Sequence, residues 1–189
     1  MITMVSHMMR TFIAIEVPEK IRKEIDDVVT DEKKRGLPIK WVKCENLHIT
    51  LKFLGEIDEY KKKEILPALQ KLTNEVTPFH ISLESIGCFP TPKNPRVVWV
   101  GVIQGKEKLC SIAQNVETAL AGCGFKEEKR FHPHLTIGRI KKFCNVDEIL
   151  ERQITSASFL VNSIVLFKST LKPEGSIYEV LQKFPFGKQ

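Results

Sequence analysis

The sequence of 189 residues has no Cys-x-x-Cys pair, and its five cysteines are scattered and odd in number. A structural zinc site or a disulfide framework needs closely spaced, paired cysteines, so we expect neither. Unpaired cysteines are typical of a reducing compartment, and we therefore expect a cytoplasmic protein. The five positions are Cys44, Cys88, Cys110, Cys123 and Cys144.

The sequence also lacks a long hydrophobic run and a glycine-rich phosphate loop. No apolar stretch approaches the ~20 residues that cross a membrane, so no membrane partner is expected. Without a glycine-rich loop, an enzyme built on a nucleotide-binding fold is disfavoured. The first residues do not resemble a signal peptide, and we expect residues 1–8 to be a disordered or non-native extension.

Charge of one sign is in only slight excess, with 29 basic against 23 acidic residues and a net charge of +6. This excess favours a polyanionic partner, although abundant Lys and Glu are also typical of heat-adapted proteins. The hydrophobic content of 42% and charged content of 28% are ordinary for a globular protein. A chain of this length fits one domain, residues 1–189, of two similar lobes.

A histidine and a threonine two residues apart lie inside the apolar run at residues 46–55. Because side chains alternate along a strand, His48 and Thr50 should point to one face, with Lys52 next on that face. The apolar residues between them, and Phe53 after them, should point toward a core. One face of a core-building strand would thus carry an imidazole and a hydroxyl.

The same pattern occurs a second time at residues 131–140, where it places His134 and Thr136 on one face. For a single copy, a hydrogen-bonded strand histidine would be the simpler interpretation. Two copies about half a chain apart favour one shared site.

Hydrophobic periodicity predicts a strand–helix order that repeats once along the chain. Besides the two motif strands, strands are predicted at residues 10–17, 79–89, 97–103, 157–169 and 176–184. Helices are predicted at residues 19–35, from residue 58, and at residues 106–121 and 146–155, with a proline-rich loop at 90–96. This order predicts a duplicated α+β fold.

Two imidazoles that face one site can divide acid and base work, because an unperturbed histidine titrates near ~6.5. A neutral ring takes a proton from the nucleophile, and a protonated ring gives one to the leaving oxygen. Neighbouring hydroxyls can donate hydrogen bonds to non-bridging phosphate oxygens. These groups suit metal-free attack at phosphorus with an alkoxide leaving group.

Metal ligation is the competing use of these histidines, since His132 shares the face of His134 in an ideal strand. However, neither motif contains a carboxylate, and threonine is a poor zinc ligand. We therefore expect neither a metal nor an organic cofactor.

With these motifs, the chain resembles the 2H phosphoesterases, a superfamily with two His-x-Thr/Ser motifs. Within them it is similar to the RNA 2′,3′-cyclic phosphodiesterases of bacteria and archaea, also called 2′-5′ RNA ligases. The similarity covers nearly the whole chain after Met9. It rests on residues 10–15, Trp41, residues 48–55, Phe89-Pro90, residues 96–101 and residues 133–139.

The resemblance implies two pseudo-symmetric α+β lobes, each an antiparallel sheet with helices on its outer face, and a cleft between the sheets. It implies hydrolysis of a terminal 2′,3′-cyclic phosphate on RNA to a 2′-phosphate, and also 2′-5′ joining of RNA ends. By this likeness His48 and His134 are catalytic, and Thr50 and Thr136 bind phosphate. The expected partners are RNA ends, tRNA fragments among them, and the expected state is a monomer.

Further site residues are expected around this set. Arg139 matches a basic position of the branch and would bind phosphate, although strict alternation places it opposite His134 unless a bulge at Gly138 turns it. Phe53 and Trp99 are candidates to stack a base, as is Trp41, with burial in the core as the ordinary alternative for each. Lys52 is expected to share the face of Thr50, and a solvated lysine without a role in the site is the ordinary alternative.

Two other functions fit the same residues. One is a phosphodiesterase that acts on 2′-5′ oligonucleotides or on small cyclic nucleotides. The other is a non-catalytic module that binds RNA ends, but simple binding of phosphate favours Arg or Lys over two histidines. Turnover of a substrate that carries a cyclic phosphate would separate catalysis from binding.

Overall fold

The computed structural model describes residues 8–128 and 130–187, and residues 1–7 of the predicted extension lie outside this range. The strands are β1 (Met9–Glu16), β2 (Ile39–Trp41), β3 (His48–Ile57), β4 (Phe79–Ile81), β5 (Leu83–Thr91), β6 (Asn94–Val102), β7 (His134–Ile140), β8 (Phe159–Val161), β9 (Ser163–Lys172) and β10 (Gly175–Pro185). The helices are α1 (Glu19–Lys33), α2 (Glu59–Asn74), α3 (Lys106–Ala121) and α4 (Asp147–Leu150), with a 3-10 turn η1 (Cys44–Asn46).

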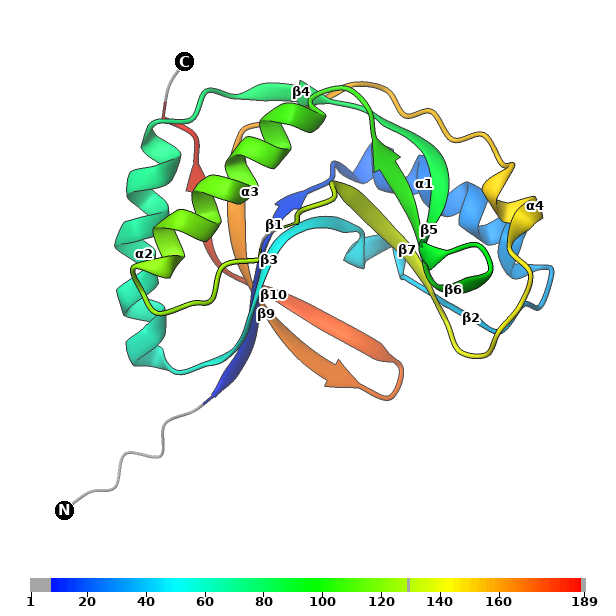
Figure 1. Cartoon of the computed structure of the whole chain (residues 1–189), viewed down its shortest axis with the longest axis horizontal. Helices are drawn as coiled ribbons and strands as arrows, with labels where there is room; N and C mark the ends of the chain where they lie inside the picture. Colours follow the sequence, from blue (N-terminus) through cyan, green and yellow to red (C-terminus); the bar gives the residue numbers. More distant parts are fainter. Residues whose placement is uncertain (1–7, 129, 188–189) are drawn as a thin grey trace.

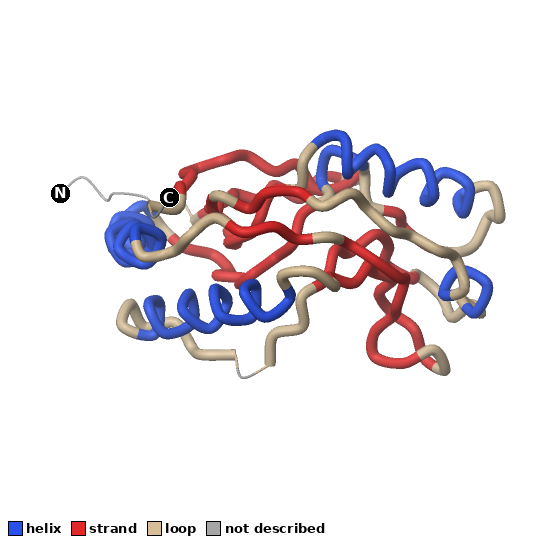
Figure 2. The backbone as a smooth tube through the Cα atoms, turned by 90° about the horizontal axis from the view of Figure 1, so that it is seen from above, coloured by secondary structure: helices blue, strands red, loops and turns tan. Residues whose placement is uncertain are grey.

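Two four-stranded antiparallel sheets form the two lobes. The first sheet has the order β10-β9-β1-β3 and the second the order β2-β7-β6-β5, while β4 and β8 form a small separate ribbon. The strands fill the middle of the molecule and the helices lie outside them (Figure 2). Helices α2 and α3 pack against the first sheet, and α4 packs against β5 of the second sheet, on the side of the molecule where α1 also lies (Figure 1). The predicted two-lobed α+β fold is confirmed.

Each sheet takes strands from both halves of the chain. Strands β1 and β3 come from the first half and pair with β9 and β10 from the end of the chain. Conversely, β2 and β5 join β6 and β7 in the second sheet. The repeated strand–helix order therefore does not correspond to one lobe per half.

The first sheet has different apolar clusters on its two faces. One face contributes to the main core, where residues such as Ile13 and Ile49 pack together with Leu135 of the second sheet. Burying each such side chain stabilises the fold by about 1.5–3 kcal/mol. On the other face, a small cluster consists of Phe12, Ala14, Val165 and Phe167, with Tyr178 against it. This second cluster forms the floor beneath the first motif.

Several predicted elements differ from the structure because their residues pair with other strands, some of them far away in the sequence. The expected strand at 79–89 is two strands in different sheets, and the expected strand at 157–169 is likewise divided into β8 and β9. The expected loop at 90–96 is a tight hairpin, in which Thr91 pairs with Asn94. The expected helix at 146–155 stops after one turn, because residues 154–156 instead form backbone hydrogen bonds with β5.

The three long helices follow their predicted apolar spacing. In α1, for example, Ile21, Ile25 and Val29 are buried. Helix α2 begins at Glu59, and the side chain of the preceding Asp58 accepts a hydrogen bond from the backbone N–H of Lys61, as expected of a helix N-cap. None of the helices in the described part of the chain is long and apolar enough to span a membrane.

Candidate active site

The two motif strands, β3 and β7, lie side by side where the two sheets meet (Figure 1). His48 is the first residue of β3, and His134 is the first residue of β7. The two imidazoles therefore occupy equivalent positions in their sheets.

The first motif occupies the same sheet face as the small aromatic cluster. In the register of the antiparallel pair, Ala14 lies opposite Thr50 and Phe12 lies opposite Phe53. Leu51 has no partner in this register, so a β-bulge interrupts the alternation there.

The bulge overturns two of the expectations from strict alternation. Lys52 was expected beside Thr50, but it is buried, with 4% exposure, and contacts α3 rather than the site. Phe53 was expected in the core, but it is 56% exposed and shares the face of Thr50. The exposed ring of Phe53 is thus accessible to a base, whereas Trp41 packs against the main core.

The second motif has a bulge at the equivalent position, Ile137. Thr136 lies opposite Trp99 and Arg139 lies opposite Val97, with Ile137 left unpaired between them. As a result His134, Thr136 and Arg139 share one face, which strict alternation would not allow. The bulge lies one residue before the position that the sequence suggested.

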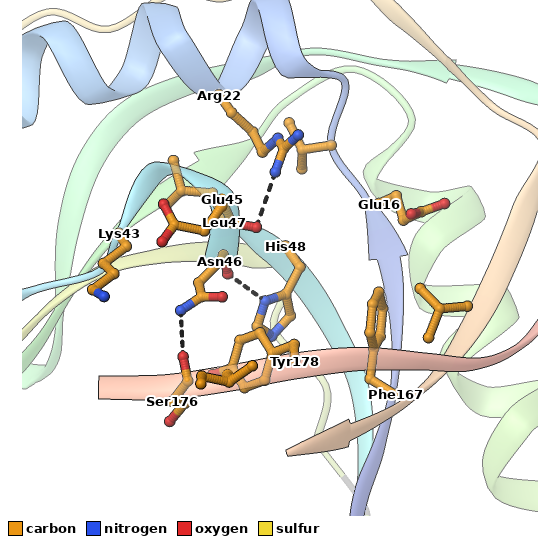
Figure 3. Close-up of a pocket in the computed structure, with 13 residues that line it drawn as sticks. Glu16, Arg22, Lys43, Glu45, Asn46, Leu47, His48, Phe167, Ser176 and Tyr178 are labelled. Carbon is orange, nitrogen blue, oxygen red and sulfur yellow. Dashed lines mark hydrogen bonds between the residues drawn. The ribbon is translucent and has the colours of Figure 1, made fainter. Parts of the chain in front are cut away.

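Both imidazoles are held by the same backbone hydrogen bond. Nδ1 of His48 lies 2.6 Å from the carbonyl oxygen of Asn46 (Figure 3), and Nδ1 of His134 lies 2.6 Å from that of His132. A carbonyl oxygen only accepts, so each Nδ1 donates its proton. In the neutral ring Nε2 then carries the free lone pair that a general base needs.

Aromatic side chains fix the plane of each imidazole. The ring centroid of His48 lies 4.8 Å from Phe12 and 5.1 Å from Tyr178, and Figure 3 shows Tyr178 beside the imidazole. The ring centroid of His134 lies 5.1 Å from Phe89 and 6.3 Å from Trp99. Trp99 therefore lies at the site, and its indole crosses Gly87, where a Cβ atom would collide with it.

Burial lowers the pKa of both histidines. The pKa of His48 falls to about 4, mainly because the ring is buried, and the positive charges of Arg139 and His134 lower it further. Burial also lowers the pKa of His134, with contributions from the charges of His132 and Arg139. In each case the hydrogen bond to the backbone carbonyl opposes the shift. Both rings are therefore neutral near pH 7 when no anion is bound.

Hydroxyl and guanidinium groups complete the set. Thr50 and Thr136 are half-buried, and within the described ranges their hydroxyls make no internal hydrogen bond. Arg139 is exposed and forms no ion pair with any described carboxylate. All three groups can therefore bind an external anion.

A pocket of about 340 Å³ opens beside His48. Its walls come from η1, from the aromatic rings of Phe167 and Tyr178, and from the basic side chains of Arg22 and Lys43 (Figure 3). No residue of β7 lines it, so the pocket extends from His48 away from the second motif. Its size and its aromatic wall suit a small organic ligand.

Metal ligation was the competing use of the motif histidines, and it needs several ligating side chains close together. In the described part of the chain, no three His, Cys, Asp or Glu side chains come together as metal ligands would. The ring centroids of His132 and His134 are 6.4 Å apart, and the ring of His132 packs 5.2 Å from Trp99.

Sequence reasoning missed several residues that build this site. The orienting carbonyls belong to Asn46 and His132, two residues before each motif histidine, and a backbone carbonyl leaves no signal in the sequence. Phe12 lies on the face of its strand that is opposite the main core. Tyr178 comes from the last strand, and nothing in its local sequence indicates a contact with His48.

Comparisons with known proteins agree with this geometry. The family model of the 2′-5′ RNA ligase superfamily matches residues 17–172. The RNA 2′,3′-cyclic phosphodiesterase of Methanocaldococcus jannaschii is 41% identical over 181 residues, which is 93% of this chain and 100% of that protein. The protein of the same name from Archaeoglobus fulgidus is 40% identical, over 93% of this chain and 99% of its own.

Among solved structures, the crystal structure of TT0787 from Thermus thermophilus matches with a TM-score of 0.82 at 27% identity. The match covers 96% of this chain and 100% of that one. The paired motif strands, the extent of the family match and the identity to curated relatives lead to one conclusion. The chain belongs to the 2′-5′ RNA ligase superfamily.

Proposed function

We propose that this protein is an RNA 2′,3′-cyclic phosphodiesterase that opens a terminal cyclic phosphate to a 2′-phosphate. The main observation is the pair of imidazoles, each of which donates from Nδ1 to a backbone carbonyl oxygen. They lie on β3 and β7, one strand from each sheet, and these strands also carry Thr50, Thr136 and Arg139. The curated relatives, which are RNA 2′,3′-cyclic phosphodiesterases, support the same activity.

In this reaction a water molecule attacks phosphorus and the bond from phosphorus to the ribose 3′-oxygen breaks. One imidazole takes a proton from the water through Nε2, and the other, protonated, gives a proton to the departing 3′-oxygen. The products are a 2′-phosphate and a free 3′-hydroxyl. The two roles belong to His48 and His134, and the equivalent hydrogen bonds of the two rings suit either assignment.

The remaining groups stabilise the charge that builds on the non-bridging oxygens. The hydroxyls of Thr50 and Thr136 donate hydrogen bonds, and the guanidinium of Arg139 supplies a positive charge near both imidazoles. The bound phosphate in turn raises the pKa of the nearby imidazoles, so that one of them becomes protonated. The pocket beside His48 gives room for the nucleoside that carries the phosphate.

Ligation uses the same groups with a different nucleophile. If the 5′-hydroxyl of a second RNA replaces water, attack on the cyclic phosphate with loss of the 3′-oxygen forms a 2′-5′ linkage. The superfamily to which the chain belongs is named for this activity. We therefore propose 2′-5′ ligation as a second reaction of the same site.

The finer assignments concern substrate, oligomeric state and location. We propose tRNA fragments with cyclic ends as substrates, in line with the net charge of +6. We also propose a monomer, because all groups named above come from one chain. The five unpaired cysteines support a reducing, cytoplasmic location.

A short oligoribonucleotide with a 2′,3′-cyclic end should be converted to the 2′-phosphate in the presence of excess EDTA. The chemistry needs no metal, because the imidazoles supply both proton transfers. Phosphorus NMR distinguishes the 2′-phosphate from the 3′-phosphate, and a non-cyclic 3′-phosphate serves as a control. The proposal fails if the cyclic end stays intact, or if EDTA stops turnover and a divalent ion restores it. Faster cleavage of 2′-5′ oligonucleotides would favour the alternative phosphodiesterase.

The pH optimum of kcat/KM should lie below that of kcat. The parameter kcat/KM reports the free protein, in which burial lowers the pKa of His48 to about 4 and also lowers that of His134. In the free protein, the form in which one of the two imidazoles is protonated is therefore lost as the pH rises toward 7. In the complex, the negative phosphate raises the pKa values, so kcat persists to higher pH. Full pH profiles of kcat/KM and of kcat give the two apparent pKa values of the coupled histidine pair. Coincident profiles would contradict this account.

A further inference from the structure

A buried ion pair joins the first motif strand to helix α3. The Nζ atom of Lys52 lies 2.6 Å from Oε2 of Glu117, and the two side chains are only 2% and 7% exposed. Lys52 follows Thr50 by two residues, but the bulge at Leu51 turns it away from the catalytic face. The pair therefore lies behind the site and cannot touch a substrate there.

Both members of the pair also hold the backbone of the same short segment. Lys52 Nζ donates to the carbonyl oxygen of Lys126 at 2.9 Å, and Oε2 of Glu117 accepts from the backbone N–H of Glu128 at 3.0 Å. Further along this segment, the carbonyl oxygen of His132 accepts the hydrogen bond that orients the second imidazole. The pair thus binds the backbone at Lys126 and Glu128, a few residues before the carbonyl that orients the ring.

The two motifs differ in how this orienting carbonyl is supported. In the first motif, Asn46 belongs to η1, and its side-chain amide donates to the carbonyl oxygen of Ser176 at 2.7 Å. In the second motif, the described residues between α3 and β7 contain no strand, helix or 3-10 turn. Contacts with other elements hold this region instead: the ring of His132 packs 5.3 Å from Phe89 and 5.2 Å from Trp99, and the Lys52–Glu117 pair binds the backbone nearer to α3.

We propose that Lys52 and Glu117 are positioning residues for His134, through which the first motif strand sets the place of the second imidazole. A positional role fits a buried pair, because the cost of removing two charges from water offsets most of their attraction. The inference rests on the proposed function where activity is the readout. The state of the imidazole, however, can be measured without any substrate.

The test compares Lys52→Met with the double variant Lys52→Met/Glu117→Leu. The single variant leaves a buried carboxylate without a partner and should lose stability. The double variant removes both charges at similar volume, so its Tm should recover. It still cannot bond to Lys126 and Glu128, and its kcat should fall by about 10- to 100-fold, since a misplacement of ~1 Å can cost 10²-fold.

The NMR titration of the His134 ring gives a second readout. Burial lowers its pKa in the native protein, and the neighbouring charges of His132 and Arg139 act in the same direction. If the segment loosens, the ring becomes exposed and its pKa should rise in the double variant, whereas that of His48 should not. A folded double variant with normal kcat and an unshifted His134 would overturn the proposal.

Glu32→Gln provides a matched control. Glu32, which lies on α1, is also 2% exposed, and it forms ion pairs with Arg35 at 3.0 Å and with Arg152 at 2.8 Å. This variant should lose stability but keep kcat and the pKa of His134, when assayed below its Tm. An equal loss of kcat would mean that a buried pair acts only through stability, which would overturn the proposal. If the wild-type protein has no turnover, the proposed function fails, while the NMR comparison still tests the positioning role.

Discussion

Replacing His134 with alanine should lower kcat for a 2′,3′-cyclic mononucleotide by about 10²- to 10⁴-fold, the contribution of a positioned general acid or base. Replacing His48 should cost a similar amount, because both rings have the same backbone hydrogen bond and a pKa lowered by burial. Smaller losses are expected for Thr50→Ala and Thr136→Ala, which remove one hydrogen bond to phosphate each. Steady-state kinetics of the purified variants measure these effects.

The control for the histidine variants is His80→Ala, which removes an exposed imidazole on β4 outside the site. It should leave kcat unchanged. A cyclic-phosphate substrate whose leaving group needs no proton then assigns the roles. On that substrate, loss of the acid should cost little and loss of the base should still cost much. Near-normal turnover in either motif variant would rule out the two-histidine mechanism, and equal large losses on the activated substrate would contradict separate roles.

Removing the charge of Arg139 should have the second-largest effect. Arg139→Gln should lower kcat/KM by about 10²-fold, similar to the loss of one donor to a developing oxyanion. It should also raise the pKa of both His48 and His134, because the charge of Arg139 lowers both in the native protein. Kinetics and NMR titration of the two rings measure these changes.

Arg139→Lys separates charge from geometry. The lysine keeps the positive charge, so the histidine pKa values should change less than in Arg139→Gln, but the planar fork that binds two oxygens is lost. Arg96→Gln, an exposed arginine at the β5–β6 hairpin, is the matched control on a mononucleotide substrate. Unchanged histidine pKa values in Arg139→Gln would show that the guanidinium does not act on the imidazoles.

The sequence predicted those features that depend on local pattern. Both motif strands form within or close to the predicted stretches at 46–55 and 131–140, and α1 and α3 have nearly their expected bounds, because alternation and helical spacing are properties of one segment. The α+β class and the two lobes also followed from the order of the elements and the family resemblance. The catalytic roles of these residues remain a proposal.

Features set by a partner strand could not be predicted in the same way. A bulge depends on the register with the neighbouring strand, so strict alternation placed Lys52 and Phe53 on each other's faces. Arg139 lies on the face of His134 only because Ile137 forms a bulge in the pairing with the neighbouring strand. Contacts such as that of Tyr178 with His48 depend on where the last strand pairs.

The exchange of strands between the two halves also determines when this protein can fold. Strand β1, near the start of the chain, pairs with β9, where Phe12 lies opposite Phe167. Such pairing between distant segments gives a high contact order, which slows folding, because a long loop must close before the contact forms. During synthesis on a ribosome, the floor beneath His48 cannot form until β9 has left the exit tunnel. Until then the aromatic support of the His48 imidazole is incomplete, because Phe167 belongs to β9.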